Sequence, residues 1–591
     1  MLLVVLFAIN YLASVIHTRF DLTKEKRYTL SKVTKELVRQ LDDDVEIDVF
    51  LKGDFPAGFK KLANSTGEFL QLLKDRNGSK IHYRFISPQD EMPGTGKSYE
   101  DSLAKLGVVA INLSAQVKAG EENKRVYPVA LVKYKGKQEL VSLYAGGKRM
   151  ITPVEINSAE ALMEYQFAKT LDKLTSTAKP LIGYSIGNGE PLMGNQTVNG
   201  VPQYINPATA DLEYTLRSNY ELFTLNLNRQ AFIPDTFKVL MIVKPSTQFT
   251  EDEKLKIDQY LMRGGKLLCF IDNLYAEQES LQRKAETVTT SRGLKPTLSD
   301  SDEEDLGPQT IAYDRNLNLT DQFFKYGFRI NTDLLMDLQC DFLPFAAGGS
   351  ANDPQYEFLH WNYYPLFESK GNHTINRNIG LVAGRFVNSI DTINAAGISK
   401  TILLSSSADS RTISTPALIS TAENRNAPED ANFNRADIPA AVLLEGSFTS
   451  LYKNRASQSQ LDSLKKTGYP FLQQSNSNAK IIAVADGDIV LNDVSPQYGP
   501  LPMGLNFFTA GTQYEYQFAN RDFLLNCLEY LVSKPGIIET RNKDIVLRLL
   551  NTQKVEQQKG TWQFINIGLP VLIIMLLGLI YQQIRRRKYA A

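Results

Sequence analysis

The stretch PLIGYSIGNGEP, residues 180–191, places Ser185 between Gly183 and Gly187. This Gly-x-Ser-x-Gly spacing is that of a hydrolase nucleophile elbow, in which a sharp strand-to-helix turn exposes the serine hydroxyl. The chemistry also needs a helix directly after the serine, and an acid and a histidine later in the chain. Glycines and a proline follow the serine instead, and helical periodicity begins only near Ala208. The pattern therefore favours a strand that leaves a sheet through a glycine turn.

That turn consists of Gly187, Asn188, Gly189 and Glu190. Loops at the carboxyl ends of parallel strands, near the point where the strand order reverses, are where such sheets bind ligands. The four residues are therefore our candidate surface for contact with a ligand or a neighbouring domain. A purely structural turn is the favoured alternative, because glycine and asparagine are common turn residues.

Two further patterns have the residue types of a cofactor or metal site. Gly94-Thr-Gly-Lys-Ser98 resembles the end of a phosphate-binding loop, but that loop needs a glycine where this chain has Glu91. Asp486, Asp488 and Asp493 follow an apolar strand, and clustered carboxylates can hold a divalent ion. Their spacing matches no established ion-binding loop, so a polar turn is favoured. We predict no catalytic residue, no metal site and no cofactor.

The composition is that of an ordinary globular surface. The 591 residues include 65 basic and 65 acidic side chains, so a nucleic-acid partner is not expected. The cysteines Cys269, Cys340 and Cys527 lie far apart and form no Cys-x-x-C motif, which argues against a redox dithiol or a zinc knuckle. Cys269 stands in an apolar run and is predicted to be a buried thiol rather than a nucleophile.

Both ends of the chain have the composition of membrane segments. Residues 1–16 carry no charge, and residues 562–581 form an uncharged stretch close to the roughly 20 residues that span a bilayer. We interpret residues 1–17 as an uncleaved anchor, with a cleaved signal peptide as the alternative. The second transmembrane helix is predicted over residues 562–584.

The orientation follows from the basic tail, residues 585–591. Arg585, Arg586, Arg587 and Lys588 directly follow the second span, and such clusters stay in the cytoplasm. With two spans, both termini are cytoplasmic. The region from about residue 18 to about residue 560 then lies outside the cytoplasm.

Between the anchors, the periodicity predicts two α/β domains. In residues 18–178, strands near 45–51 and 80–86 alternate with a helix near 59–75, and further strands and a helix near 157–174 follow. That order favours a thioredoxin-like domain, which would lack redox chemistry because no cysteine precedes Cys269.

The second domain, residues 179–535, repeats apolar strands and amphipathic helices. Fully apolar strands in β-α-β units predict a doubly wound parallel sheet that is covered on both faces. Residues 277–308 have the polar composition of a mobile surface loop with a solvated acidic run. Residues 536–561 are predicted to form a helical stalk that leads to the second span.

Several segments together match a known pattern from one end of the chain to the other. In order, they are RFDLTKEKRYTLS, GNGEP, QYLMRGGKLLCFID, YGFRINTDLLMDLQC, PAAVLLEGSFTSLYKNR and WQFINIGLPVLIIMLLGLIYQQIRRRK. This set resembles the G component of the gliding-motility ABC transporter system of Bacteroidota, the GldG family of substrate-binding or auxiliary subunits. The central domain is also similar to the intraflagellar-transport-type domain, which has a glutamine-amidotransferase-like fold. The amidotransferase Gly-x-Cys-x-Gly elbow is absent here, so that fold is expected to serve binding.

The resemblance implies a non-catalytic, double-anchored subunit in the inner membrane, with its large domain in the periplasm. Its implied partners are a polytopic ABC permease, a cytoplasmic ATPase, membrane lipid and periplasmic motility components, in a hetero-oligomer. One alternative is a membrane-tethered extracytoplasmic hydrolase or transferase that uses Ser185 or the Asp486/Asp488 pair. Another is a free-standing solute receptor with no permease contact.

Overall fold

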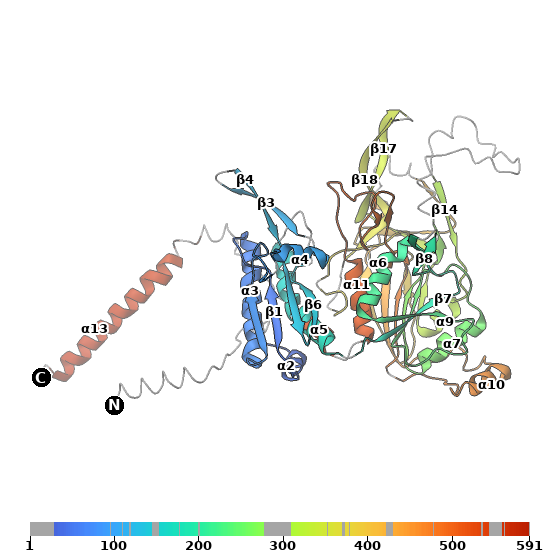
Figure 1. Cartoon of the computed structure of the whole chain (residues 1–591), viewed down its shortest axis with the longest axis horizontal. Coiled ribbons are helices and arrows are strands. Elements are labelled where there is room, and N and C mark those ends of the chain that lie inside the picture. Colours follow the sequence, from blue (N-terminus) through green and yellow to red (C-terminus); the bar gives the residue numbers. More distant parts are fainter. Residues whose placement is uncertain are drawn as a thin grey trace. The chain divides into compact units, whose positions relative to one another are not determined.

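The computed structural model divides the chain into two compact units, residues 1–543 and 544–591 (Figure 1). It describes residues 29–94, 96–108, 110–117, 120–144, 153–176, 178–198, 201–276, 309–350, 353–368, 373–377, 379–420, 430–476, 478–532, 536–542, 558, 560 and 562–589. The predicted first anchor, the predicted loop 277–308 and most of the predicted stalk lie outside the described residues.

The first sheet of unit 1 has four strands in the order β2-β1-β5-β6. Their bounds are β1 (Val45–Val49), β2 (Ile81–Phe85), β5 (Val129–Tyr134) and β6 (Lys137–Ser142). Strands β1 and β2 are parallel, β5 is antiparallel to β1, and β6 is antiparallel to β5. A separate two-stranded hairpin is formed by β3 (Ile111–Val117) and β4 (Gly120–Val126).

Helices cover both faces of this sheet. The helices are α2 (Lys32–Arg39), α3 (Ala57–Arg76), α4 (Tyr99–Lys105) and α5 (Pro153–Thr175). Because alternate strand residues face opposite sides, Val132 packs with α3 and α5, whereas Leu131 packs with Leu103 of α4. Ser98, which belongs to the rejected phosphate-loop pattern, caps α4 in a capping box.

The second sheet has seven strands in the order β10-β7-β11-β12-β25-β24-β21. Their bounds are β7 (Leu181–Ile186), β10 (Glu221–Asn226), β11 (Val239–Val243), β12 (Lys266–Phe270), β21 (Ile398–Ser405), β24 (Pro439–Gly446) and β25 (Lys480–Val484). The first five strands in the order are parallel. Strand β24 is antiparallel to β25, and β21 is antiparallel to β24.

The prediction of a purely parallel sheet is therefore wrong for two strands. Strand β24 is buried over its central residues 440–444, as are the parallel strands β11, β12 and β25 over most of their length. A strand that is buried on both faces reads as a continuous apolar run in either direction, so the pattern shows burial but not direction.

Four helices cover the faces of the seven-stranded sheet (Figure 1). Helices α6 (Ala210–Asn219) and α11 (Asn520–Val532) pack on one face, and α7 (Glu251–Met262) and α9 (Thr320–Tyr326) pack on the other. The alternation is visible within β11, where Met241 contributes to one core and Ile242 to the other. Cys269 lies fully buried in the second core, and burial raises its pKa to about 12, as the prediction of an inert thiol requires.

The chain between β12 and β25 holds small antiparallel sheets. Their strands are β13 (Leu274–Tyr275), β14 (Gln309–Asp314), β15 (Phe328–Ile330), β16 (Asp333–Asp337), β17 (Cys340–Ser350), β18 (Asp353–Phe367), β19 (Val382–Ala383), β20 (Ile390–Thr392), β22 (Ser410–Ser414) and β23 (Ala417–Ser420). The longest are β17 and β18, which form one ribbon (Figure 1). Trp361, Tyr363, Tyr364 and Phe367 of β18 are buried, so this aromatic run packs inside the protein.

Short elements complete unit 1. They are β8 (Asn195–Val198), β9 (Val201–Tyr204), η1 (Pro207–Thr209), η3 (Asp430–Asn432), α10 (Gln458–Lys466), η4 (Asp488–Val490), β26 (Val494–Ser495), β27 (Gly499–Pro500) and η5 (Ile538–Asn542). The described start of the predicted stalk, η5, is a 3-10 turn rather than an α-helix.

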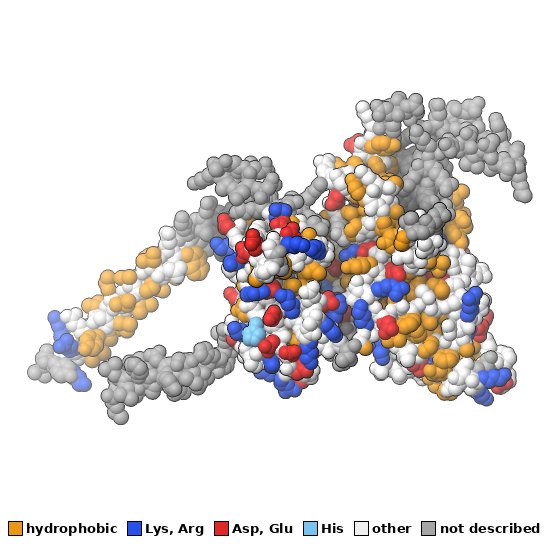
Figure 2. Space-filling model, viewed as in Figure 1, with side chains coloured by type: hydrophobic (Ala, Val, Ile, Leu, Met, Phe, Trp, Pro, Cys, Tyr) orange, Lys and Arg blue, Asp and Glu red, His pale blue; other side chains and the backbone are white. Residues whose placement is uncertain are grey.

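Unit 2 contains the π-helical turn η6 (Phe564–Gly568) and the helix α13 (Leu569–Tyr589). In the described part of the chain, one helix of 25 residues, Phe564–Lys588, is long and apolar enough to cross a membrane. Figure 2 shows apolar side chains along this helix and basic side chains at its end. The second predicted span thus coincides with an apolar helix.

Candidate functional site

The predicted turn lies at the strand-order reversal of the seven-stranded sheet. Strand β7 has β10 on one side and β11 on the other, although β10 lies between them in sequence. The carboxyl end of β7 is therefore the switch point where such sheets bind ligands. Gly187 and Gly189 are exposed there, whereas Asn188 and Glu190 are 3% and 4% exposed.

Hydrogen bonds hold the turn in a closed conformation. Glu190 accepts from the Ser185 hydroxyl (2.8 Å) and from the Asn188 backbone N–H (2.7 Å). The Asn188 carbonyl accepts from the backbone N–H groups of Ser246 (2.8 Å) and Thr247 (2.9 Å), which follow β11. Burial raises the pKa of Glu190. The side chains of the turn therefore point into the protein, and its exposed part is glycine backbone.

Ser185 lacks the surroundings of a hydrolase nucleophile. It is fully buried and donates its hydroxyl hydrogen to Glu190. The chain after it continues into the hairpin β8–β9, and the next described α-helix begins at Ala210. A nucleophile elbow needs an exposed hydroxyl at the start of a helix, and neither condition is met.

A second group of side chains meets at the same edge of the sheet, and the sequence analysis recognised only part of it. Lys244 follows β11, Asp272 follows β12, and Asp488 follows β25. The Lys244 ammonium lies 3.2 Å from Asp272 and forms an ion pair with Asp488. Although burial opposes the charged form, these two carboxylates raise the pKa of Lys244.

Asp486 lies behind this ion pair and is fully buried. Its two carboxyl oxygens accept from the backbone N–H groups of Asp488 (2.7 Å) and Arg385 (2.8 Å). Burial, together with the neighbouring charges of Asp488 and Asp272, raises its pKa well above the ordinary value. The main role of this carboxyl group is thus to hold two backbone segments.

The third predicted carboxylate, Asp493, pairs with a residue that the sequence analysis missed. Both guanidinium nitrogens of Arg385 contact it, at 2.5 and 2.7 Å, and the Phe507 backbone N–H donates to it at 2.8 Å. Despite burial, Arg385 lowers the pKa of Asp493. The guanidinium also lies 5.3 Å from the centre of the Tyr364 ring. Bidentate geometry makes this the strongest contact of the group.

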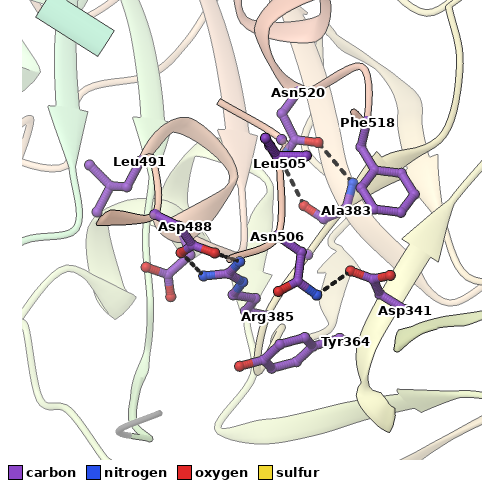
Figure 3. A pocket seen from close by; sticks show the side chains of 13 residues that line it. Asp341, Tyr364, Ala383, Arg385, Asp488, Leu491, Leu505, Asn506, Phe518 and Asn520 are labelled. Atoms are coloured by element: carbon purple, nitrogen blue, oxygen red, sulfur yellow. Dashed lines mark hydrogen bonds and ion pairs between the residues drawn. The ribbon is translucent and has the colours of Figure 1, made fainter. Parts of the chain in front are cut away.

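These side chains line a small polar hollow (Figure 3). Its volume is about 20 Å³, which is the size of one water molecule rather than an organic ligand. The Asn506 amide points at the Asp341 carboxylate, to which it donates at 2.7 Å. Asn520 exchanges two hydrogen bonds with the backbone of Ala383, each 2.9 Å long.

We call this arrangement the edge cluster. It consists of the ion pairs of Lys244 with Asp272 and Asp488, the ion pair of Arg385 with Asp493, and Asp486, which accepts from the backbone N–H groups of Arg385 and Asp488. Asp488 and Asp493 are paired with cations, and both oxygens of Asp486 are engaged by the main chain. None of the three is placed as a free general base or nucleophile. Within the described residues, no group of three or more histidine, cysteine or acidic side chains could hold a metal ion.

Comparison with protein families now identifies the class of this fold. Residues 179–527, which include the seven-stranded sheet and the edge cluster, match the family described as ABC-type uncharacterized transport system. The chain belongs to this family of auxiliary components of ABC transport systems. Membership supports a non-catalytic accessory subunit of an ABC transporter, in agreement with the engaged carboxylates.

Other similarities are partial. Residues 24–133, which contain β1 and β2, match a domain family of unknown function. An uncharacterized protein of Borreliella burgdorferi is 25% identical over 190 residues, which are 32% of this chain and 33% of that protein. The chain thus spans a third of that relative. The solved structure named mmIFT52 N-terminal domain is 11% identical and covers 60% of this chain and 99% of its own, with a TM-score of 0.30.

Proposed function

We propose that this protein is the double-anchored, non-enzymatic periplasmic subunit of an ABC transporter complex that acts in gliding motility. The observation that carries the proposal is the family match over residues 179–527. The apolar helix Phe564–Lys588 supplies a membrane anchor. The subunit would couple a polytopic permease and its cytoplasmic ATPase to a periplasmic ligand or to motility components.

The architecture agrees with two finer parts of this proposal. The order β2-β1-β5-β6, with one parallel and two antiparallel pairings, supports a thioredoxin-like domain over residues 18–178. The five parallel strands with helices on both faces support an amidotransferase-like domain over residues 179–535.

The orientation rests on the basic end of the second span. Arg585, Arg586, Arg587 and Lys588 close the apolar helix, and basic residues at the end of a span favour the cytoplasmic side. We infer that the C-terminus is cytoplasmic and that unit 1 is periplasmic. The N-terminal anchor, and with it the cytoplasmic location of the N-terminus, stays a prediction from residues 1–17.

The turn Gly187, Asn188, Gly189 and Glu190 stays our proposed contact surface at the switch point. The two glycines offer exposed backbone, while the side chains of Asn188 and Glu190 stabilise the turn from inside. A partner would therefore recognise the shape and backbone of the turn rather than its side chains.

Purification in mild detergent from native membranes tests the proposal. We expect a permease and an ATPase to copurify in fixed ratio with the full-length protein, as identified by mass spectrometry. In the control, an unrelated span replaces residues 562–584. If the native anchor packs against the permease, this variant should no longer copurify with the permease and the ATPase. Recovery of the native protein alone, with a bound solute, would refute the proposal and favour a free receptor.

A double variant separates the proposed function from the enzymatic alternative. Ser185→Ala with Asp488→Asn removes both candidate reactive groups. A coupling subunit should keep gliding and its partners, although some stability is lost. Loss of gliding in a variant that is folded and still bound to its partners would favour an enzyme.

A further inference from the structure

Helix α5 has a second packing face that lies away from its sheet. One face contributes Met163, Phe167 and Leu171 to the core of the four-stranded sheet. On the other side, Leu162 and Tyr165 belong to a separate apolar cluster. The other members of that cluster are Val33 and Leu37 of α2, Tyr530 of α11, and Ile537 and Ile538 at η5. Both chain ends of the described part of unit 1 therefore meet on one helix.

The first chain end is attached at the start of α2. The Ser31 backbone N–H donates to Glu164 of α5 at 2.7 Å. Val33, in the first turn of α2, faces Gly536 so closely that a Cβ atom at position 536 would lie 3.6 Å from the Val33 Cβ. Gly536 has a φ of +124°, which favours glycine there. The two chain ends are thus in direct contact.

The second chain end is attached through Arg541, which is 3% exposed. Its guanidinium donates to the Asn526 side chain of α11 at 2.5 Å and to the Arg377 carbonyl at 2.9 Å. It also lies 4.8 Å from the centre of the Tyr165 ring, within the range of a cation–π contact. One buried arginine therefore connects η5 to both α5 and α11.

An ion pair between a buried glutamate and a partly buried lysine connects these two helices directly. Glu529 of α11 lies 3.1 Å from the Lys169 ammonium and accepts the hydroxyl hydrogen of Tyr165. Glu529 is 4% exposed, and its charge raises the pKa of Lys169 against the effect of burial. Displacement of α5 from α11 would leave the buried Glu529 without its cation, which is costly, so the pair favours this arrangement of the two helices.

We propose that this group of contacts is a mechanical junction that clamps both chain ends to α5, so that displacement of the chain after η5 moves α5 and α11 together. We call it the tether junction, made of Glu164, Tyr165, Lys169, Glu529, Gly536 and Arg541. The inference rests on the proposed function, because it assigns the place where movement of the membrane anchor enters unit 1.

A designed disulfide tests whether the chain ends meet. The Cβ separation of 3.6 Å at positions 33 and 536 fits a disulfide, whose Cβ atoms are typically about 3.5–4.5 Å apart. Full-length Val33→Cys/Gly536→Cys should form an intramolecular disulfide on mild oxidation, seen as a reversible shift in gel mobility. Val33→Cys alone is the control. A folded double variant that keeps all five of its thiols free after oxidation, the two introduced ones and the native Cys269, Cys340 and Cys527, would overturn the junction.

Hydrogen exchange tests the coupling without relying on cysteine at a strained position. In full-length protein, Arg541→Gln should lower protection by about tenfold or more in η5 and also in α5. The control is Arg39→Gln, which breaks an exposed pair with Glu36 on α2 and should change neither element. Loss of protection in η5 alone, or no loss at all, would overturn the coupling.

Copurification with the wild-type protein separates the two proposals. It tests the accessory-subunit function, because that function requires a permease and an ATPase to copurify. Disulfide formation and the exchange pattern depend on unit 1 alone. They therefore test the junction whether or not a permease and an ATPase copurify. Shared loss of protection without any copurifying partner would support the junction and refute the transporter function.

Discussion

Breaking the pair between Arg385 and Asp493 should destabilise unit 1 more than any single surface change. The two side chains are 21% and 14% exposed, so water screens them poorly. Arg385→Met leaves Asp493 without its cation, and uncompensated buried charges cost about 3–5 kcal/mol. The remaining exposure places our expectation at the lower end, about 3 kcal/mol. Asp493→Asn keeps an acceptor for the Phe507 N–H but leaves the guanidinium unpaired, so a similar loss is expected.

The double variant Arg385→Met/Asp493→Asn isolates the interaction. With both charges removed, neither is left uncompensated, and the loss should be smaller than the sum of the single losses by about 2 kcal/mol. Urea unfolding of the detergent-solubilised protein, followed by the fluorescence of the buried Trp361, measures these free energies. Trp361 packs against the aromatic residues around Tyr364 and therefore reports on this region.

An exposed pair provides the matched control. Arg329 and Asp391 are 2.6 Å apart but 48% and 49% exposed, and such pairs contribute about 0–1 kcal/mol. Arg329→Met should therefore have little effect. The reasoning about burial would be refuted if Arg385→Met cost no more than Arg329→Met, or if the two single losses at the buried pair were additive.

Three further predictions concern the two groups at this edge. Gly468→Ala, with a φ of +81° and open space around it, should cost only the backbone strain of about 1–3 kcal/mol. Gly189→Ala should cost more than that, because φ is +76° and the new Cβ would also collide with the Ser246 hydroxyl. Unfolding curves compare the two variants, and equal losses would contradict the collision. Ser185→Ala should cost about 1–3 kcal/mol, because buried Glu190 loses a donor, and should leave copurifying partners unchanged. The folded pKa of Asp493 lies below its unfolded value, so its stabilisation is present at neutral pH and is lost as the pH falls below about 4; urea midpoints of Asp493→Asn should depend less on pH in that range, and an unchanged acid profile would argue against the shift.

The alternation of elements in both sheets could be predicted because burial leaves a strong pattern in sequence. The all-buried strand β11 shows the continuous apolar run of a strand covered on both faces, and the amphipathic helix α2 shows the period of 3.6. Strand direction could not be predicted, as β24 shows. The ribbon β17–β18 was also missed, because the aromatic residues of β18 are unevenly spaced and show no regular alternation.

The candidate site shows a similar division. The turn at Gly187 to Glu190 was visible because glycine marks a change of direction after an apolar strand. The edge cluster was visible only at Asp486, Asp488 and Asp493, which are neighbours in sequence. Lys244 and Asp272 gave the same local signal, one charged residue after an apolar strand, but only the strand order brings β11, β12 and β25 together. Arg385 had no local signal at all.

The edge cluster and the tether junction lie at opposite ends of the same strands. Lys266, the first residue of β12, donates to the Leu531 carbonyl near the end of α11, and Lys480, the first residue of β25, lies 4.1 Å from the Tyr530 ring centre. The tether junction is therefore at the amino end of the sheet, and the edge cluster is at the carboxyl end.

Displacement that enters at η5 would reach the carboxyl edge through hydrogen-bonded parallel strands, of which β11, β12 and β25 are almost entirely buried. Buried core strands are among the most stable elements of a fold. Arg385 then joins that edge to the chain between β12 and β25, which carries the ribbon β17–β18. The partner contacts of a coupling subunit are accordingly expected on the switch-point turn and this ribbon, at the end of the sheet farthest from the chain that leads to the membrane helix. Gly189→Ala and Arg541→Gln should then affect coupling independently, because the two positions lie at opposite ends of the sheet, and their effects on gliding speed should multiply in the double variant. If the double variant glides no more slowly than the slower single variant, the two substitutions do not act independently, which would contradict this prediction.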